Sequence, residues 1–290
     1  MTRTWYRIAL GRTEGAPIVV AAAGEHMGVA VAAAERHARG AFAIAAEPAP
    51  DSDIPLGESL GKSMVVELGA APPVPVFRWP VGALPQLSRA AELGEVRRGW
   101  LVRPHASLLV IEAQTDAEHL TDLFMGMIER LPSADNLEIR MQEHFDDAGR
   151  ADVWLTSRVD AKRILRFLDD HDAELFGNGH LELSIYVRAQ KATLRLTEHK
   201  TVVWLSDRRA VDGTARPFGL ADGRGQAPAV DGTDVQGWLR ELAVPRVDSL
   251  ITVKDGPHYH YRPANSRDRK KLGDELYRQR LRRVDSRASS

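Results

Sequence analysis

Two segments, TDAEHLTDLFMGMIERL (residues 115–131) and DAKRILRFLDDHDAELFGNG (residues 160–179), have the clearest helix patterns in the chain. In the first, Thr115 and Glu118 have the spacing of a capping box. Apolar residues then recur on one helical face until a proline ends the pattern. In the second, Asp160 is a suitable N-cap, and a Gly-Asn-Gly sequence follows the last apolar residue. Both segments therefore predict amphipathic helices.

Strand-like runs precede, separate and follow these helices, and in them apolar residues alternate with polar ones. Such alternation is typical of an antiparallel sheet with one buried face. Residues 194–196 and 202–205 add a predicted hairpin. The resulting order, βαββαβ, predicts a ferredoxin-like sandwich with both helices on one sheet face. The apolar positions of the alternating runs are Leu137, Ile139 and Met141, then Val153 and Leu155, then Leu181, Leu183, Ile185 and Val187.

The remainder of the chain predicts a second small α+β domain and a basic C-terminal region. At the N-terminus, strands are expected at 4–10, 18–22, 42–46, 64–68 and 74–79, with a helix at 25–39. The fold class is therefore α+β, with two small domains. The predicted parts are an N-terminal domain (1–80), a connection with one short helical piece (81–103), the ferredoxin-like domain (104–206), a Gly/Pro-rich loop (207–233), and a C-terminal hairpin with a basic helical tail (234–290).

Composition excludes some kinds of chemistry. The chain has no cysteine, so it has no disulfides, thiolate zinc site or cysteine nucleophile. No apolar run approaches the ~20 residues of a membrane span, and the first residues lack a secretory signal pattern. We expect a cytoplasmic and, from its arginine- and alanine-rich composition, bacterial protein, with no membrane partner and no cofactor.

Charge is distributed unevenly along the chain. Residues 1–102 have no net charge, residues 103–253 have 18 basic and 25 acidic side chains, and residues 254–290 have 11 basic and five acidic ones. Arginine and lysine side chains suit phosphate oxygens and carboxylates. A thin leucine stripe suggests that the predicted tail helix docks either on the chain's own acidic middle domain or on another protein. The candidate binding residues of this tail are Arg267, Arg269, Lys270, Lys271, Tyr277, Arg278, Arg280, Arg282 and Arg283.

A histidine pair is the most unusual local pattern. On a strand, His258 and His260 point to the same face and could chelate a divalent metal or act in acid–base catalysis. Asp255 is the nearest further ligand. A tight metal site usually needs three or four ligands, so we favour a half-exposed strand of the hairpin expected at 249–262.

Three other motifs fit ordinary structural interpretations better than functional ones. Residues 57–61 match G-x-S-x-G, and residues 61–63 resemble the end of a phosphate-binding loop, but neither has the flanking strand and helix that its motif requires. Residues 169–172, Asp-Asp-His-Asp, face different directions on a helix. We interpret the first two as one flexible loop and the third as a solvated helix face.

These patterns favour a non-enzymatic subunit or adaptor that binds another macromolecule, most simply a protein, through the basic tail and one sheet face. A nucleic-acid-binding protein that uses the tail as a phosphate clamp is the first alternative. A metal-dependent hydrolase or nuclease built on His258 and His260 is the second. The sequence leaves enzymatic activity open but favours its absence.

Overall fold

A computed structural model describes residues 3–50, 65–80, 82–93, 96–142, 151–207, 230, 232–250, 259–261 and 266–284. The chain forms two compact units, which are described separately. Unit 1 consists of Met1–Arg97, Asp116–Glu118 and Ile251–Pro263, and unit 2 of Arg98–Thr115, His119–Leu250 and Ala264–Ser290. The chain is a mixed α+β protein with a C-terminal helix, as predicted.

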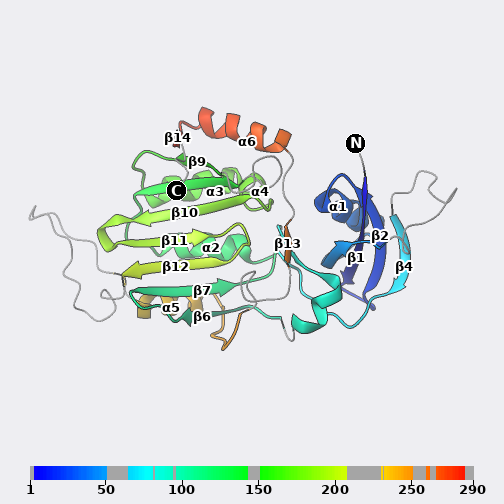
Figure 1. Ribbon diagram of the computed structural model, residues 1–290. Coiled ribbons are helices and arrows are strands. Elements are labelled where there is room, and N and C mark those ends of the chain that lie inside the picture. Colours follow the sequence, from blue (N-terminus) through cyan, green and yellow to red (C-terminus); the bar gives the residue numbers. More distant parts are fainter. Residues whose placement is uncertain are drawn as a thin grey trace, which may run out of the picture. The chain divides into compact units, whose positions relative to one another are not determined.

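Unit 1 is built on a four-stranded antiparallel sheet in the order β3-β1-β2-β4 (Figure 1). Helix α1 packs on it with small side chains, and Ala30, Val31 and Ala34 are fully buried. A separate short strand, β5, pairs with β13. The elements are β1 (Thr4–Arg12), β2 (Ile18–Gly24), α1 (Met27–His37), β3 (Ala41–Pro48), β4 (Val65–Ala70), β5 (Ala83–Pro85), the 3-10 helix η3 (Leu87–Leu93) and β13 (Tyr259–Tyr261).

The strand predicted at 74–79 is wrong, because this segment has no regular secondary structure. Prolines at 72, 73 and 75 lack the N–H groups that a ladder requires. The apolar residues that suggested a strand are nevertheless used: Phe77 and Trp79 are buried with their ring centroids 4.8 Å apart in an edge-to-face arrangement.

Unit 2 is built on an eight-stranded antiparallel sheet in the order β14-β9-β8-β10-β11-β12-β7-β6. Its strands are β6 (Gly99–Arg103), β7 (Leu108–Gln114), β8 (Asn136–Gln142), β9 (Ala151–Leu155), β10 (Leu181–Val187), β11 (Ala192–Leu196), β12 (Val202–Asp207) and β14 (Arg282–Val284). Its helices are α2 (Leu120–Glu129), α3 (Ala161–Asp170), α4 (Asp172–Leu175), the 3-10 helix η4 (Arg188–Gln190), α5 (Gly232–Glu241) and α6 (Ser266–Arg278).

The predicted element order is present, but the strand order is not that of a ferredoxin-like sandwich. In that fold the first strand lies beside the third and fourth strands, whereas β7 pairs with β12 and β6. The chain continues after β10 through short turns into β11 and β12, which lie between β10 and β7. Short turns favour antiparallel neighbours, so the predicted hairpin is confirmed and separates strands that were expected to be adjacent.

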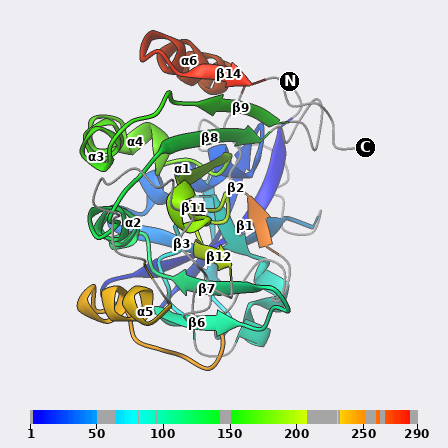
Figure 2. The same ribbon diagram turned by 90° about the vertical axis from the view of Figure 1, so that its left-hand side faces the viewer.

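Helices α2, α3 and α5 lie on one face of this sheet (Figure 2). Helices α2 and α3 contact each other, and both share a core with the sheet. The prediction that both helices cover the same face is therefore confirmed. Helix α5 adds to this layer: Val235 and Leu239 are buried, and the Trp238 and Trp204 rings meet edge to face at 6.3 Å.

The two predicted helix starts have different outcomes. The Asp160 carboxylate accepts a hydrogen bond from the Arg163 backbone N–H at 2.8 Å, so this cap is confirmed. The capping box is wrong: α2 begins at Leu120 with no side-chain cap, and the Glu118 side chain instead pairs with Arg78. The second helix is also shorter than expected, because the backbone leaves the helical conformation at His171. No helix in the described part of the chain is long and apolar enough to cross a membrane.

Candidate functional site

Helix α6 is held on unit 2 by its apolar stripe. Leu272 and Leu276 are buried, as is Leu281 just after the helix, and all three belong to the core that includes α2 and α3. Gly273 faces the Trp154 ring of β9, where a Cβ atom would lie 3.6 Å from the ring. The predicted tail is therefore an integral element of unit 2 over the residues that the structure describes.

Asp152 on β9 joins α6 to β14. Its Oδ1 atom accepts a hydrogen bond from Arg283 Nη2 at 2.5 Å, and its Oδ2 atom lies 3.8 Å from Arg269 Nη2. Two arginines therefore share one carboxylate. Burial, and then the positive charge of Arg283, lower the pKa of Arg269 from its ordinary value. This arrangement places the helix and the strand side by side and leaves a local excess of positive charge.

The other described cations of this region point outward. Arg278 pairs with Glu275, three residues earlier on the helix, at 2.9 Å. In the described part of the chain, no carboxylate pairs with the four other exposed cations, which are Lys270, Lys271, Arg280 and Arg282. Tyr277 is 75% exposed and Val284 is 44% exposed. We call this the basic α6–β14 surface, and it consists of Lys270, Lys271, Tyr277, Arg278, Arg280, Arg282 and Val284.

Arg280 occupies a backbone position that favours glycine. Its φ angle is +63°, in the left-handed region. The Leu281 N–H donates to the Leu276 carbonyl at 3.0 Å, and the Arg280 N–H donates to the Tyr277 carbonyl at 2.9 Å, so the turn closes the C-terminus of α6. A left-handed residue at such a cap is usually glycine, because other side chains cost about 1–2 kcal/mol there. Arginine is thus present at a position where the backbone conformation favours glycine.

The structure separates the nine tail residues that the sequence grouped together. Arg269 and Arg283 face Asp152, whereas the five other described cations are exposed. Arg267 lies in the first turn of α6, and its side chain is outside the described set. Arg269 precedes Leu272 and Leu276 by three and seven residues, and this helical spacing could have identified it as inward-facing.

The histidine pair is only partly visible. Asp255 and His258 lie outside the described residues. The backbone of His260 lies in β13, opposite Leu84 of β5, so the described part of the predicted hairpin pairs with another segment of unit 1. Among the residues that the structure describes, no three His, Asp or Glu side chains gather in a way that could hold a metal ion.

The Asp-Asp-His-Asp motif forms no cluster. Asp169 and Asp170 are exposed at the end of α3, and the His171 ring packs against Phe167 with centroids 4.8 Å apart. The G-x-S-x-G loop at 57–61 lies outside the described residues.

Sequence reasoning missed a buried lysine in the β11–β12 turn. Lys200 is 1% exposed, and its Nζ atom donates to the Leu181 carbonyl at 3.4 Å. Burial lowers its pKa to about 7, against the opposing attraction of Glu198 and Glu182. Its φ angle of +62° is again left-handed. The Thr197 N–H donates to the Thr201 carbonyl at 3.0 Å, so Lys200 is the last residue of a three-residue hairpin loop (198–200), where this conformation is expected. The loop length could have indicated the left-handed backbone of Lys200, but no neighbouring residue indicated that its side chain is buried.

The sheet face opposite the helices carries charges of both signs that interact with one another. The Arg140 guanidinium lies 3.5 Å from Glu138 and 3.7 Å from Glu182. The Tyr186 hydroxyl donates to Glu138 at 2.8 Å, and burial together with this contact raises the pKa of Tyr186 to about 12. Arg103 and Glu112 pair at 2.7 Å. In this network each of these arginines lies beside a carboxylate.

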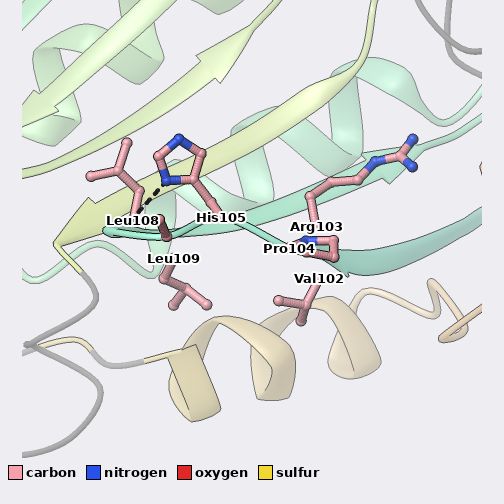
Figure 3. A pocket seen from close by; sticks show the side chains of 7 residues that line it. Val102, Arg103, Pro104, His105, Leu108 and Leu109 are labelled. Atoms are coloured by element: carbon pink, nitrogen blue, oxygen red, sulfur yellow. Dashed lines mark hydrogen bonds between the residues drawn. The ribbon is translucent and has the colours of Figure 1, made fainter.

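A shallow cavity of about 500 Å³ surrounds the β6–β7 turn (Figure 3). His105 Nδ1 accepts the backbone N–H groups of Ser107 and Leu108 at 3.3 and 3.1 Å, so the imidazole stabilises the turn. Leu109 on the opposite side packs against Gly232 of α5. The polar groups at this cavity are engaged in the hairpin itself and converge on no common point.

Comparisons of the chain with models of protein families, with curated proteins and with solved structures gave no match.

Proposed function

We propose that the chain is a non-enzymatic subunit that binds an acidic segment of a partner protein through the basic α6–β14 surface. The observation that supports this most directly is Arg280, a cation that occupies a left-handed cap position. Strained backbone positions are often found at functional sites. The anchored leucines and the Asp152 ion pairs hold the surrounding cations on a fixed scaffold, which lowers the entropic cost of binding.

The composition of the surface supports an interface. Residues 266–284 contain eight basic and three acidic side chains, whereas an ordinary solvated face mixes both signs. Exposed tyrosine and arginine are enriched at protein interfaces. Tyr277 follows the exposed Lys270 by seven residues, which places both on the same face of the helix, about two turns apart.

A protein partner fits better than nucleic acid. Asp274 and Glu275 lie among the cations of α6, and a continuous row of phosphates would meet their repulsion. A protein segment with a few carboxylates can avoid these positions. The metal-dependent enzyme alternative has no further support from the described residues.

The test compares two charge-reversed variants of the full chain. Lys270→Glu with Lys271→Glu changes the proposed surface, and Arg36→Glu with Arg39→Glu makes the same charge change on exposed residues of unit 1. The probe is a fluorescein-labelled polyglutamate peptide, with polyglutamine as the neutral counterpart, and the readout is fluorescence anisotropy. We expect salt-sensitive polyglutamate binding that weakens at least tenfold, about 1.4 kcal/mol, only in the first variant.

Two results would contradict the proposal. One is the absence of polyglutamate binding at low ionic strength, where exposed charge interactions are strongest. The other is an equal loss in both variants, which would mean that net charge and not this surface governs binding. Tighter binding of a single-stranded oligonucleotide of equal charge would instead support the nucleic-acid alternative.

A further inference from the structure

β14 is the last strand of the eight-stranded sheet and has a single neighbour. It pairs with β9 in antiparallel register, with Arg282 opposite Leu155 and Val284 opposite Val153. No strand of the described part of the chain lies along its other edge. An edge strand presents backbone N–H and C=O groups that a further strand can use.

The opposite edge of the same sheet differs. On β6, the Trp100 N–H donates to the Pro245 carbonyl, and the Trp100 carbonyl accepts the Val247 N–H, both at 2.9 Å. The segment after α5 therefore occupies hydrogen-bonding groups of that edge. Among the described residues, the edge at β14 carries exposed charged side chains and no covering strand.

The side chains of β14 determine what could pair with it. Arg283 is opposite Trp154 and turns to Asp152 on the helix side, so Arg282 and Val284 project to the other face. A second copy of β14 would bring arginines close to arginines, which is unfavourable for directly opposed residues. A carboxylate opposite Arg282 and an apolar side chain opposite Val284 would be favourable.

We propose that an extended acidic segment of the partner adds to β14 as a ninth strand of the sheet. Its carboxylates would lie near Arg282 and Arg280, and an apolar residue two positions from a carboxylate would cover Val284. This mode deepens the proposed function and depends on it. Main-chain hydrogen bonds would fix the position of the segment, and the alternating side chains would select its sequence.

The test uses a labelled synthetic peptide in which glutamate and valine alternate on one face, with threonine between them. Two further peptides have the same sequence but carry backbone N-methyl groups on one or the other alternate set of residues. In an added strand only one set of N–H groups faces β14. We expect one methylated peptide to bind the full chain at least tenfold more weakly, and the other to bind within about threefold of the parent.

Amide hydrogen exchange of the full chain provides a second readout. Binding of the parent peptide should slow exchange at residues 282–284 and leave β6 unchanged. If both methylated peptides bind like the parent, or both lose affinity equally, strand addition is refuted while charge-driven binding stands. If the parent and polyglutamate both fail to bind, the proposed function itself fails.

Discussion

Replacing Lys200 with methionine should make unit 2 more stable at neutral pH. The lysine amine is fully buried with one described hydrogen-bond acceptor, the Leu181 carbonyl. Its pKa falls from 10.5 to about 7 because burial disfavours the charged form more than Glu198 and Glu182 favour it. Methionine has a similar length and no charge, so it fills the same space without this penalty.

The magnitude follows from proton linkage. Between pH 7 and 10.5 the unfolded chain binds a proton at Lys200 and the folded chain does not. The free energy of unfolding of the native protein therefore rises with pH in this window, by about 1.4 kcal/mol per unit. Below pH 7 both states are protonated, and the full penalty remains, on the order of 5 kcal/mol. The Lys200→Met variant lacks this dependence and should exceed the native protein in stability most at pH 7 and below.

The assay is urea unfolding followed by tryptophan fluorescence at several pH values between 7.5 and 9.5. The upper limit avoids Tyr186, whose raised pKa of about 12 contributes stability that is lost as pH rises from 10 towards 12. The difference between the two proteins should shrink by about 3 kcal/mol over this range. A difference that stays constant with pH would show that Lys200 keeps its charge in the folded protein, and would refute the argument.

Three other changes test the α6–β14 region. Arg280→Gly should raise the free energy of unfolding by about 1 kcal/mol, because glycine relieves the strain of the left-handed backbone. The same change should weaken acidic-peptide binding in the anisotropy assay. Unchanged binding would argue against a role for this cation. Leu276→Ala should destabilise unit 2 by about 2–5 kcal/mol through a buried cavity, seen as a lower urea midpoint, and an unchanged midpoint would contradict the docking of α6. Asp152→Asn should leave Arg269 and Arg283 without their shared carboxylate and lower stability by on the order of 1 kcal/mol for this partly exposed group; the loss should diminish in high salt.

Local patterns predicted the helices and most strands, because capping and side-chain periodicity depend on neighbouring residues. The cap at Asp160 and the alternation of β10 are examples. Local patterns could not predict the strand order, because nothing in the sequence of β7 indicates that β12 will be its neighbour. The face of β9 was also misread, since Val153 and Leu155 were expected in the core, whereas Trp154 packs there opposite Ile139. A short strand with apolar residues at successive positions does not specify which face is buried.

The sequence predicted which residues form the candidate site but not where their side chains lie or which partners they contact. Counting charges identified the basic tail, yet Asp152 lies more than 100 positions earlier in the chain and gives no sequence indication of its two arginine partners. The left-handed backbone of Arg280 was equally hidden, because this conformation is expected for glycine or asparagine, and no neighbouring residue indicates the burial of Lys200.

The long sequence separation between β9 and its partner β14 has a consequence for biosynthesis. Strand β9 and the Trp154 side chain emerge from the ribosome long before the residues that cover them, by on the order of ten seconds at ordinary translation rates. In unit 1, strand β5 is likewise synthesised long before its partner β13. Neither unit can complete its fold until these later segments have been synthesised, so the strands that they cover stay exposed on the nascent chain until then. Arg282 and Arg283 are synthesised after β9, so until then the β9 edge lacks both its strand partner and their positive charges.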